Sequence, residues 1–368
     1  MRARPRSLFG LIGALGVVYA RKRPVVCLIA GGALALGLVV ALARGPAAGP
    51  AAVGGLRAAV LRDGFAVHRA GSNRHRLLEL DRGGASRRAY TIERPGELRA
   101  VGTQGGLAVA WQDGHKVELR LAGDDKQSST WGNSVRQLCE GAASSDARFA
   151  VGWLEADDSV WIVHGPVGAA PRRSDDDDTD DAVPAGEDGA TVAALAAPAS
   201  AAHNEWCGVA SAEQNVAMLW RSGDRLSILM CTKKRCGALP GTFKLPREVS
   251  LIGLGCVRDA CLLATRAPSG AAHVSYVTSS GRRKWTQPLA ASSPTVSIIG
   301  YGDRALAVGY AGPDGAEVLR FDAAGASTPL WRDPASHGAP ALAWSSGRML
   351  VAHYHGDQIA NEVIAAPR

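Results

Sequence analysis

The sequence predicts an all-β fold, a seven-bladed β-propeller of four-stranded antiparallel blades, preceded by one N-terminal transmembrane helix. Three observations predict it. A short apolar motif recurs seven times at a nearly constant period, the segments around its copies are short runs broken by Gly, Asp and Ser, and one uncharged apolar run lies near the N-terminus. The 368 residues are 46% hydrophobic and include 44 Gly, which suits a large core built from many short strands.

The first expected element is the uncharged run 25–43. As a helix with about 1.5 Å rise per residue it nearly crosses a hydrocarbon layer of roughly 30 Å. Basic residues precede it and should stay in the cytoplasm, and they are Arg2, Arg4, Arg6, Arg21, Lys22 and Arg23. The expected order is a cytoplasmic leader at 1–24, a bacterial inner-membrane anchor at 25–43, a flexible linker at 44–55 and a periplasmic propeller at 56–368.

Signal cleavage is the alternative for this segment. Ala41-Leu42-Ala43 fits the A-x-A pattern that precedes a secretory cleavage site, so the protein would be secreted after cleavage near Ala43. The apolar run is long for a signal peptide, and an uncleaved anchor is therefore the preferred interpretation.

The second element is the repeat itself. Its copies start 42, 42, 67, 46, 44 and 44 residues apart, and they are FAVHR (65–69), LAVAW (107–111), FAVGW (149–153), VAMLW (216–220), LLATR (262–266), LAVGY (306–310) and LVAHY (350–354). The interval of 67 contains an acidic, low-complexity stretch, which we interpret as a disordered insertion at about 166–190 in the third blade. Without it the period is near 44, the range of propeller blades.

Turn chemistry separates a propeller from a helical solenoid of similar period. The copies run into D-G and S-G turns, as in "WQDGHKVELRL" and "WRSGDRLSILM", and short runs joined by such turns are typical of hairpins. A fourth run often closes on an aromatic residue, at Tyr90, Trp131, Trp285 and Trp331. The aromatic residues of the motif are expected to pack between blades, and they are Trp111, Trp153, Trp220, Tyr310 and Tyr354.

Ring closure is the least determined feature. The seventh copy is followed by one more run only, which makes three strands in that blade. Propellers usually close with a strand from the other terminus, but residues 50–55 are rich in Gly and Ala and are poor strand formers. Six or eight blades therefore stay open as alternatives.

The "D-x-x-G…W" turn of blade six, and more loosely of blades one and five, resembles quinoprotein-type (PQQ-like) propeller repeats. The resemblance implies the propeller fold. Because such repeats also build cofactor-free bacterial scaffolds, it does not imply a quinone, and no cofactor is expected. A quinone-dependent dehydrogenase ranks third among the functional hypotheses.

The cysteines predict disulfides. Six of the seven lie beyond the anchor, and "CTKKRC" and "CVRDAC" each place two of them across an expected hairpin tip. The expected pairs are Cys231–Cys236, Cys256–Cys261 and, by elimination, Cys139–Cys207 on the inner strands of blades three and four. The alternative is a zinc site made by the four cysteines of the two close pairs.

Candidate ligand-face residues lie in the expected second-to-third turns. "HYHGDQ" places His353, His355 and Asp357 together, and a His-x-His with a carboxylate is a possible metal set. His68 stands at the position of His353 in blade one. Acidic residues recur in the same turns, at Asp113, Asp157, Asp158, Asp224 and Asp314. Turn preference alone explains most of these carboxylates, so no metal is assigned.

The charge distribution and the absence of known catalytic motifs limit the classes of function that the sequence predicts. The net charge of +7 is gathered largely before the anchor, without a basic helix or an RNA motif, so no nucleic acid partner is expected. No G-x-S-x-G, S-x-x-K, H-E-x-x-H or P-loop occurs. We expect a non-catalytic binding or scaffold module with a protein partner, which the acidic insertion could help to dock. The alternative is a propeller hydrolase or lyase that acts on a glycan or lactone at the central mouth.

Overall fold

The computed structural model describes residues 55–103, 106–123, 128–141, 143–144, 148–166, 191–195, 204–212, 215–231, 236, 241–301 and 304–365. The predicted leader and anchor lie outside the described residues, as do nearly all of the linker and of the acidic insertion. Within the described ranges, no helix has the length and apolar content needed to cross a membrane.

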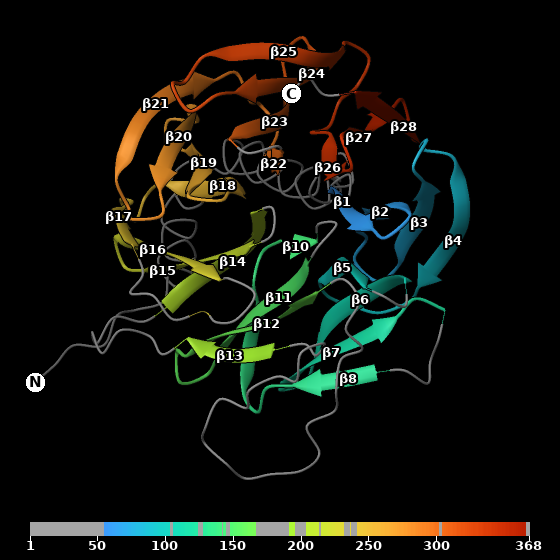
Figure 1. The fold of residues 1–368 in the computed structure, drawn as a ribbon, viewed down its shortest axis with the longest axis vertical. Coiled ribbons are helices and arrows are strands. Elements are labelled where there is room, and N and C mark those ends of the chain that lie inside the picture. The colour runs from blue at the N-terminus through green and yellow to red at the C-terminus, as the bar shows by residue number, and fades with distance from the viewer. Residues whose placement is uncertain are drawn as a thin grey trace, which may run out of the picture. The chain divides into compact units, whose positions relative to one another are not determined.

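Seven antiparallel sheets follow one another along the chain, and Figure 1 shows them arranged in that order around a common axis. The protein is an all-β, seven-bladed propeller, as predicted. Each blade places its first strand nearest the axis and adds later strands outward.

The innermost strands are β1 (Leu56–Leu61), β5 (Leu98–Thr103), β9 (Val135–Leu138) with β10 (Ala143–Ser144), β14 (Asn204–Ala212), β18 (Ser250–Val257), β22 (Ser297–Tyr301) and β26 (Ala341–Ser345). The second strands are β2 (Gly64–Arg69), β6 (Gly106–Asp113), β11 (Arg148–Glu155), β15 (Asn215–Ser222), β19 (Ala260–Arg266), β23 (Ala305–Gly312) and β27 (Arg348–His355). All seven copies of the repeated motif lie in these second strands, which confirms the blade assignment.

The third strands are β3 (His75–Asp81), β7 (Lys116–Leu121), β12 (Val160–Pro166), β16 (Arg225–Cys231), β20 (Ala272–Thr278), β24 (Gly315–Phe321) and β28 (Gln358–Ala365). The outermost strands are β4 (Ser86–Ile92), β8 (Ser128–Trp131), β13 (Thr191–Leu195), β17 (Gly241–Lys244), β21 (Arg283–Leu289) and β25 (Ser327–Asp333). The predicted insertion falls between β12 and β13.

The core lies between neighbouring blades. Leu262 and Val274 of blade five, for example, pack in one buried cluster with Leu306 and Val308 of blade six. The five aromatic residues of the motif are each between 1% and 6% exposed, which confirms that they fill the space between blades. Close to the axis the strands approach so tightly that a Cβ at Gly102 would lie 1.9 Å from the Val60 carbonyl oxygen.

Two blades depart from the four-stranded pattern. In blade three, β9 and β10 both pair with β11, so the innermost strand is divided into two pieces. In blade seven, the described residues form only three strands, β26, β27 and β28. The strand that follows the linker, β1, belongs to blade one and is not shared with blade seven.

Three disulfides join the six predicted cysteines. Cys256 and Cys261 face each other across β18 and β19, and Cys231 at the end of β16 bonds to Cys236. The bond between Cys139 and Cys207 links blade three to the innermost strand of blade four. The four cysteines that the zinc alternative would need are thus bonded in pairs.

Candidate functional site

The predicted ligand-face carboxylates lie at or beside the turns that follow the second strands, and most of them are exposed. Their contacts are local. Asp158 Oδ1 pairs with Arg136 Nη1 at 2.6 Å, and Asp157 Oδ1 accepts a hydrogen bond from the Ser159 amide at 2.9 Å. Asp224 and Asp314 face Lys244 and Arg332 at 3.9 and 3.7 Å, and Asp113 and Asp357 are exposed. Among the described residues, these carboxylates form no group of three possible metal ligands.

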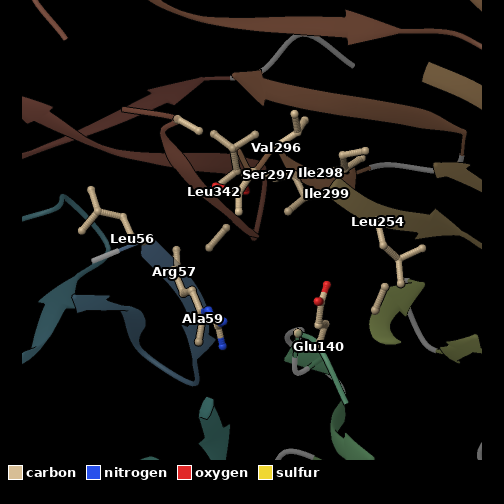
Figure 2. Close-up of a pocket in the computed structure, with 18 of the residues that line it drawn as sticks. Leu56, Arg57, Ala59, Glu140, Leu254, Val296, Ser297, Ile298, Ile299 and Leu342 are labelled. Carbon is tan, nitrogen blue, oxygen red and sulfur yellow. Dashed lines mark hydrogen bonds between the residues drawn. The ribbon is translucent and has the colours of Figure 1, made fainter. Parts of the chain in front are cut away.

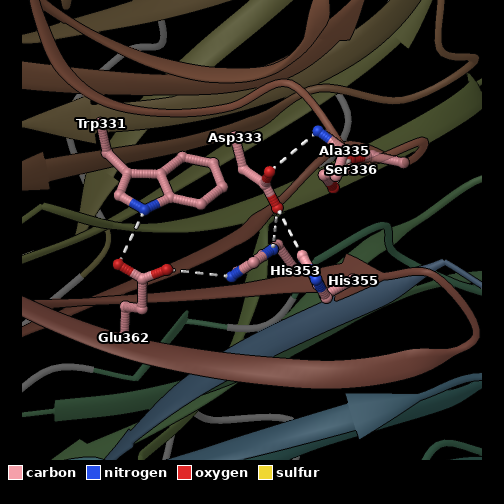
Figure 3. Close-up of polar contacts among 8 residues, drawn as sticks. Trp331, Asp333, Ala335, Ser336, His353, His355 and Glu362 are labelled. Carbon is pink, nitrogen blue, oxygen red and sulfur yellow. Dashed lines mark hydrogen bonds and ion pairs between the residues drawn. The ribbon is translucent and has the colours of Figure 1, made fainter.

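The predicted His353 and His355 share a carboxylate that sequence reasoning missed. Asp333, the last residue of β25 in blade six, places Oδ2 at 3.2 Å from His353 Nδ1 and 3.4 Å from His355 Nδ1 (Figure 3). His353 Nε2 lies 3.3 Å from Glu362 Oε1 on β28. The sequence does mark Asp333, because an Asp-Pro pair ends the fourth strand of blade six. Asp333 lies too far along the chain from the two histidines for the contact to be predicted from sequence.

This cluster links blade six to blade seven. His353 is 3% exposed, and its ring lies 4.7 Å from the Trp331 ring, whose Nε1 donates to Glu362 Oε2 at 3.0 Å. Burial acts to raise the pKa of Asp333, but the Ala335 amide and the two histidines outweigh it and lower that pKa. An ionised Asp333 therefore holds β27 of blade seven against the end of blade six.

His68 has a different partner from its repeat counterpart. Its Nε2 lies 3.1 Å from His75 Nδ1, and each side chain is 1% exposed. Burial, followed by the charge of Arg57, lowers the pKa of His68 to about 3. The pKa of His75 is also lowered, chiefly by burial, so the pair is neutral around pH 7.

A cavity of about 870 Å³ lies among the innermost strands and is lined by residues from all seven blades. Figure 2 shows Glu140 reaching into it, with Ile299 and Leu342 across from that carboxylate. Leu254 and the partly exposed Trp206 and Trp344 add further apolar surface. The cavity therefore has one strongly apolar wall. A volume of this size is typical of a ligand pocket.

The opposite wall carries two arginines and two glutamates. Arg99 is 1% exposed, donates from Nε to the Cys139 carbonyl at 2.8 Å and pairs through Nη2 with Glu97. Arg57 Nη1 donates to the Leu98 carbonyl at 3.4 Å. Burial and then the charge of Arg99 lower the pKa of Arg57 to about 10. Arg57, Arg99 and Glu97 thus each pair with one another or with a backbone carbonyl.

Glu97 shows which chemistry this wall favours. Its burial acts to raise its pKa, but Arg99, through charge and hydrogen bonding, outweighs it and lowers the pKa. A carboxylate held ionised in this way is poorly suited to act as a general acid, which needs a raised pKa. Glu97 is therefore better suited to pair with a cation than to donate a proton.

No known family model matches the sequence, and no curated protein matches it either. Solved structures do match its fold. A crystal structure of BBS1N in complex with ARL6DN aligns with a TM-score of 0.52 at 10% identity, covering 86% of this chain and 92% of that chain. The WD40 domain from Toxoplasma gondii coronin aligns with a TM-score of 0.50 at 12% identity, covering 86% and 82%. At these identities the likeness establishes the propeller fold alone.

Proposed function

We propose that this protein is a membrane-anchored periplasmic propeller that acts as a non-catalytic binding or scaffold module, and that a protein partner docks at the mouth of the central cavity. The observation that carries the proposal is the cavity itself, which combines an apolar wall containing two partly exposed tryptophans with a wall of engaged charges. Aromatic side chains in a concave, apolar setting are the usual anchors of binding surfaces.

The ionisable groups of the cavity favour binding over catalysis. The described residues that line it offer Arg57, Arg99, Glu97 and Glu140 as charged groups, and no His or Cys. Glu97 is ionised by Arg99, so it lacks the raised pKa of a general acid. A partner segment with its own apolar and charged groups fits these walls better than a reacting substrate.

A structural relative shows that the same fold can carry a bound protein. The BBS1N structure with a TM-score of 0.52 was determined in complex with ARL6DN. Rigid propellers present loops and a central mouth on one disc, which suits docking. The identity of 10% makes this a parallel in architecture only.

The proposed location rests on two features. The uncharged run 25–43 has the length of a membrane-spanning helix, and basic residues precede it. Three disulfides lie in the propeller, and disulfides persist chiefly in oxidising compartments such as the bacterial periplasm. We therefore place the propeller on the periplasmic side of the inner membrane.

One experiment tests the module and its location together. The tagged full chain is followed through membrane and soluble fractions, purified from detergent-solubilised membranes and analysed by mass spectrometry. We expect the chain in the membrane fraction with one stoichiometric partner. Glu140→Arg and Ile299→Lys, which alter the cavity, should reduce partner recovery at least roughly tenfold, since interface charges and apolar anchors dominate binding.

Matched variants separate cavity docking from a general charge effect. Arg88→Glu reverses an exposed charge on β4, far from the inner strands, and should leave partner recovery unchanged. A chain lacking residues 171–189 tests the contribution of the acidic insertion. A chain purified without any partner, or a partner retained by both cavity variants, would contradict the proposal. Either result would favour the alternative, a hydrolase or lyase that acts at the central mouth.

A further inference from the structure

The Cys231–Cys236 disulfide lies beside a buried histidine. His164 on β12 of blade three is 0% exposed, and its Nε2 lies 3.3 Å from Cys236 Sγ of blade four. The three possible ligand atoms of His164, Cys231 and Cys236 lie within 4.8 Å of one another. Among the described residues this is the only group of three such side chains that could share one ion.

A second disulfide of the same loop length allows a comparison of how accessible the two bonds are. Cys256–Cys261 has the same sequence separation of 5, but both of its cysteines are 0% exposed. Cys236 is partly exposed, whereas its partner Cys231 is buried. Thiol–disulfide exchange requires access of the attacking thiolate to a sulfur. Cys236 Sγ is therefore the more accessible target.

We propose that Cys231–Cys236 is a reducible disulfide, and that its dithiol form binds a zinc-class ion together with His164. This inference is independent of the proposed scaffold function. It also differs from a site made of four cysteines, because its third ligand comes from the neighbouring blade.

The exchange balances with a dithiol reductant. One thiolate of the reductant attacks Cys236 Sγ, the Cys231–Cys236 bond breaks, and the Cys231 sulfur leaves and takes a proton. The second thiol of the reductant then attacks the mixed disulfide and releases Cys236. The reductant is oxidised to its own disulfide by two electrons, and the protein gains two thiols.

Metal binding then needs the two sulfurs, which are bonded to each other in the oxidised protein, to move apart. Zinc binds sulfur at about 2.3 Å and nitrogen at about 2.0–2.1 Å, so two sulfurs on one tetrahedral ion lie roughly 3.8 Å apart. The third ligand is already close, since His164 Nε2 lies 3.3 Å from Cys236 Sγ. The ion displaces a proton from each thiol, and His164 must present Nε2 as a lone pair with its proton on Nδ1. Three protein ligands leave a fourth position for water.

The first measurement identifies the reducible bond. The full chain carrying Cys27→Ser, which removes the remaining thiol, is treated with graded dithiothreitol, alkylated and mapped by peptide mass spectrometry. We expect label on Cys231 and Cys236 at a dithiothreitol concentration at least roughly tenfold below that needed for the other four cysteines, because only this bond includes a partly exposed cysteine. Equal or earlier labelling of Cys256 and Cys261 would overturn the proposal.

The second measurement detects the ion. After partial reduction and removal of dithiothreitol, Co(II) is added without oxygen, and thiolate-to-cobalt absorption is recorded. We expect one ion per chain, displaced by Zn(II), and no absorption in the oxidised protein. His164→Ala and the polar variant His164→Gln should each weaken Co(II) binding at least roughly tenfold, since even indirect partners of a metal contribute that much.

A matched histidine provides the control. His273 on β20 belongs to the blade of the Cys256–Cys261 pair, and His273→Ala should leave Co(II) affinity unchanged. Thermal unfolding of the oxidised variants verifies that they fold. The absence of thiolate absorption, or Co(II) affinity unchanged in both His164 variants, would overturn the metal site.

Discussion

Arg99 shows how the wall of the central cavity holds a charge in a buried position. With 1% of its surface exposed, an unpaired guanidinium there would be costly. Its Nε instead donates to the Cys139 carbonyl of the next blade at 2.8 Å, and its Nη2 pairs with Glu97. Because Cys139 lies 40 positions along the chain, nothing local in the sequence distinguishes Arg99 from an exposed strand arginine.

His68 gives a prediction for pH dependence. The unfolded chain takes up a proton at His68 near its ordinary pKa of 6.5, whereas the folded protein resists protonation until about pH 3. Unfolding therefore binds a proton between these values, and stability falls as the pH drops through this window. We expect His68 to account for a loss of about 2 kcal/mol between pH 7 and pH 5, measured by urea unfolding.

Two variants test this assignment. His68→Gln cannot titrate, so its unfolding free energy should fall less between pH 7 and pH 5. His115→Gln removes an exposed histidine from the turn between β6 and β7 and should keep the steeper dependence of the parent protein. An identical pH dependence in His68→Gln and the parent would show that His68 is not the group responsible.

At the scale of elements, the three disulfides close loops of very different length. Cys139–Cys207 spans 68 residues, whereas Cys256–Cys261 spans 5. The longer crosslink also sits beside backbone hydrogen bonds between the inner strands of blades three and four, from Glu140 N to the Cys207 carbonyl and from Val209 N to the Glu140 carbonyl. This bond fixes two neighbouring blades, and the loop that it closes contains the predicted acidic insertion.

Removing each bond should therefore have a different cost. Cys139→Ala with Cys207→Ala should destabilise the protein by roughly 2 kcal/mol more than Cys256→Ala with Cys261→Ala, because a longer loop loses more entropy on crosslinking. All four cysteines are at most 1% exposed, so the two double variants alter equally buried residues. Urea unfolding in non-reducing buffer measures the difference, and equal losses would contradict the loop-length argument.

The strands and the close disulfides could be predicted because residues near one another in the sequence determine them. The repeated motif located all seven second strands because a buried second strand needs the same run of apolar residues in every blade. The close cysteine pairs were predictable from hairpin geometry. Asp333 was not identified, since its partners His353 and His355 lie on another blade, and the local H-Y-H-G-D sequence had pointed instead to Asp357.

At the scale of the whole molecule, the cavity could not be predicted from any single segment. Its walls combine residues from all seven blades, and only the ring places Arg57 of β1 across from Leu254 of β18 (Figure 2). Propellers recognise ligands with such composite surfaces, so the repeat predicts a central mouth without predicting its chemistry.

The ring closes between blades seven and one by side-chain packing. Val60, Phe65 and Val67 of blade one pack in one buried cluster with Leu350 and Ala352 of blade seven. Arg348 Nη1 adds a hydrogen bond to the Arg82 carbonyl at 3.2 Å. No strand within the described residues is exchanged between these two blades, so the closing contact depends on apolar burial.

Closure by packing predicts that one interface opens more readily than the others. Leu350→Ala and Leu263→Ala remove the same atoms from second strands, each leucine is 0% exposed, and each should cost about 2–5 kcal/mol. Leu350 lies at the closing interface, so its variant should also speed native-state hydrogen exchange throughout β1, β2 and β27 by separating blades seven and one. Leu263 lies between blades four and five. These two blades are also held by blades three and six, so we expect them to separate less readily. If both variants instead speed exchange uniformly, the ring is held by more than the packing of blades one and seven.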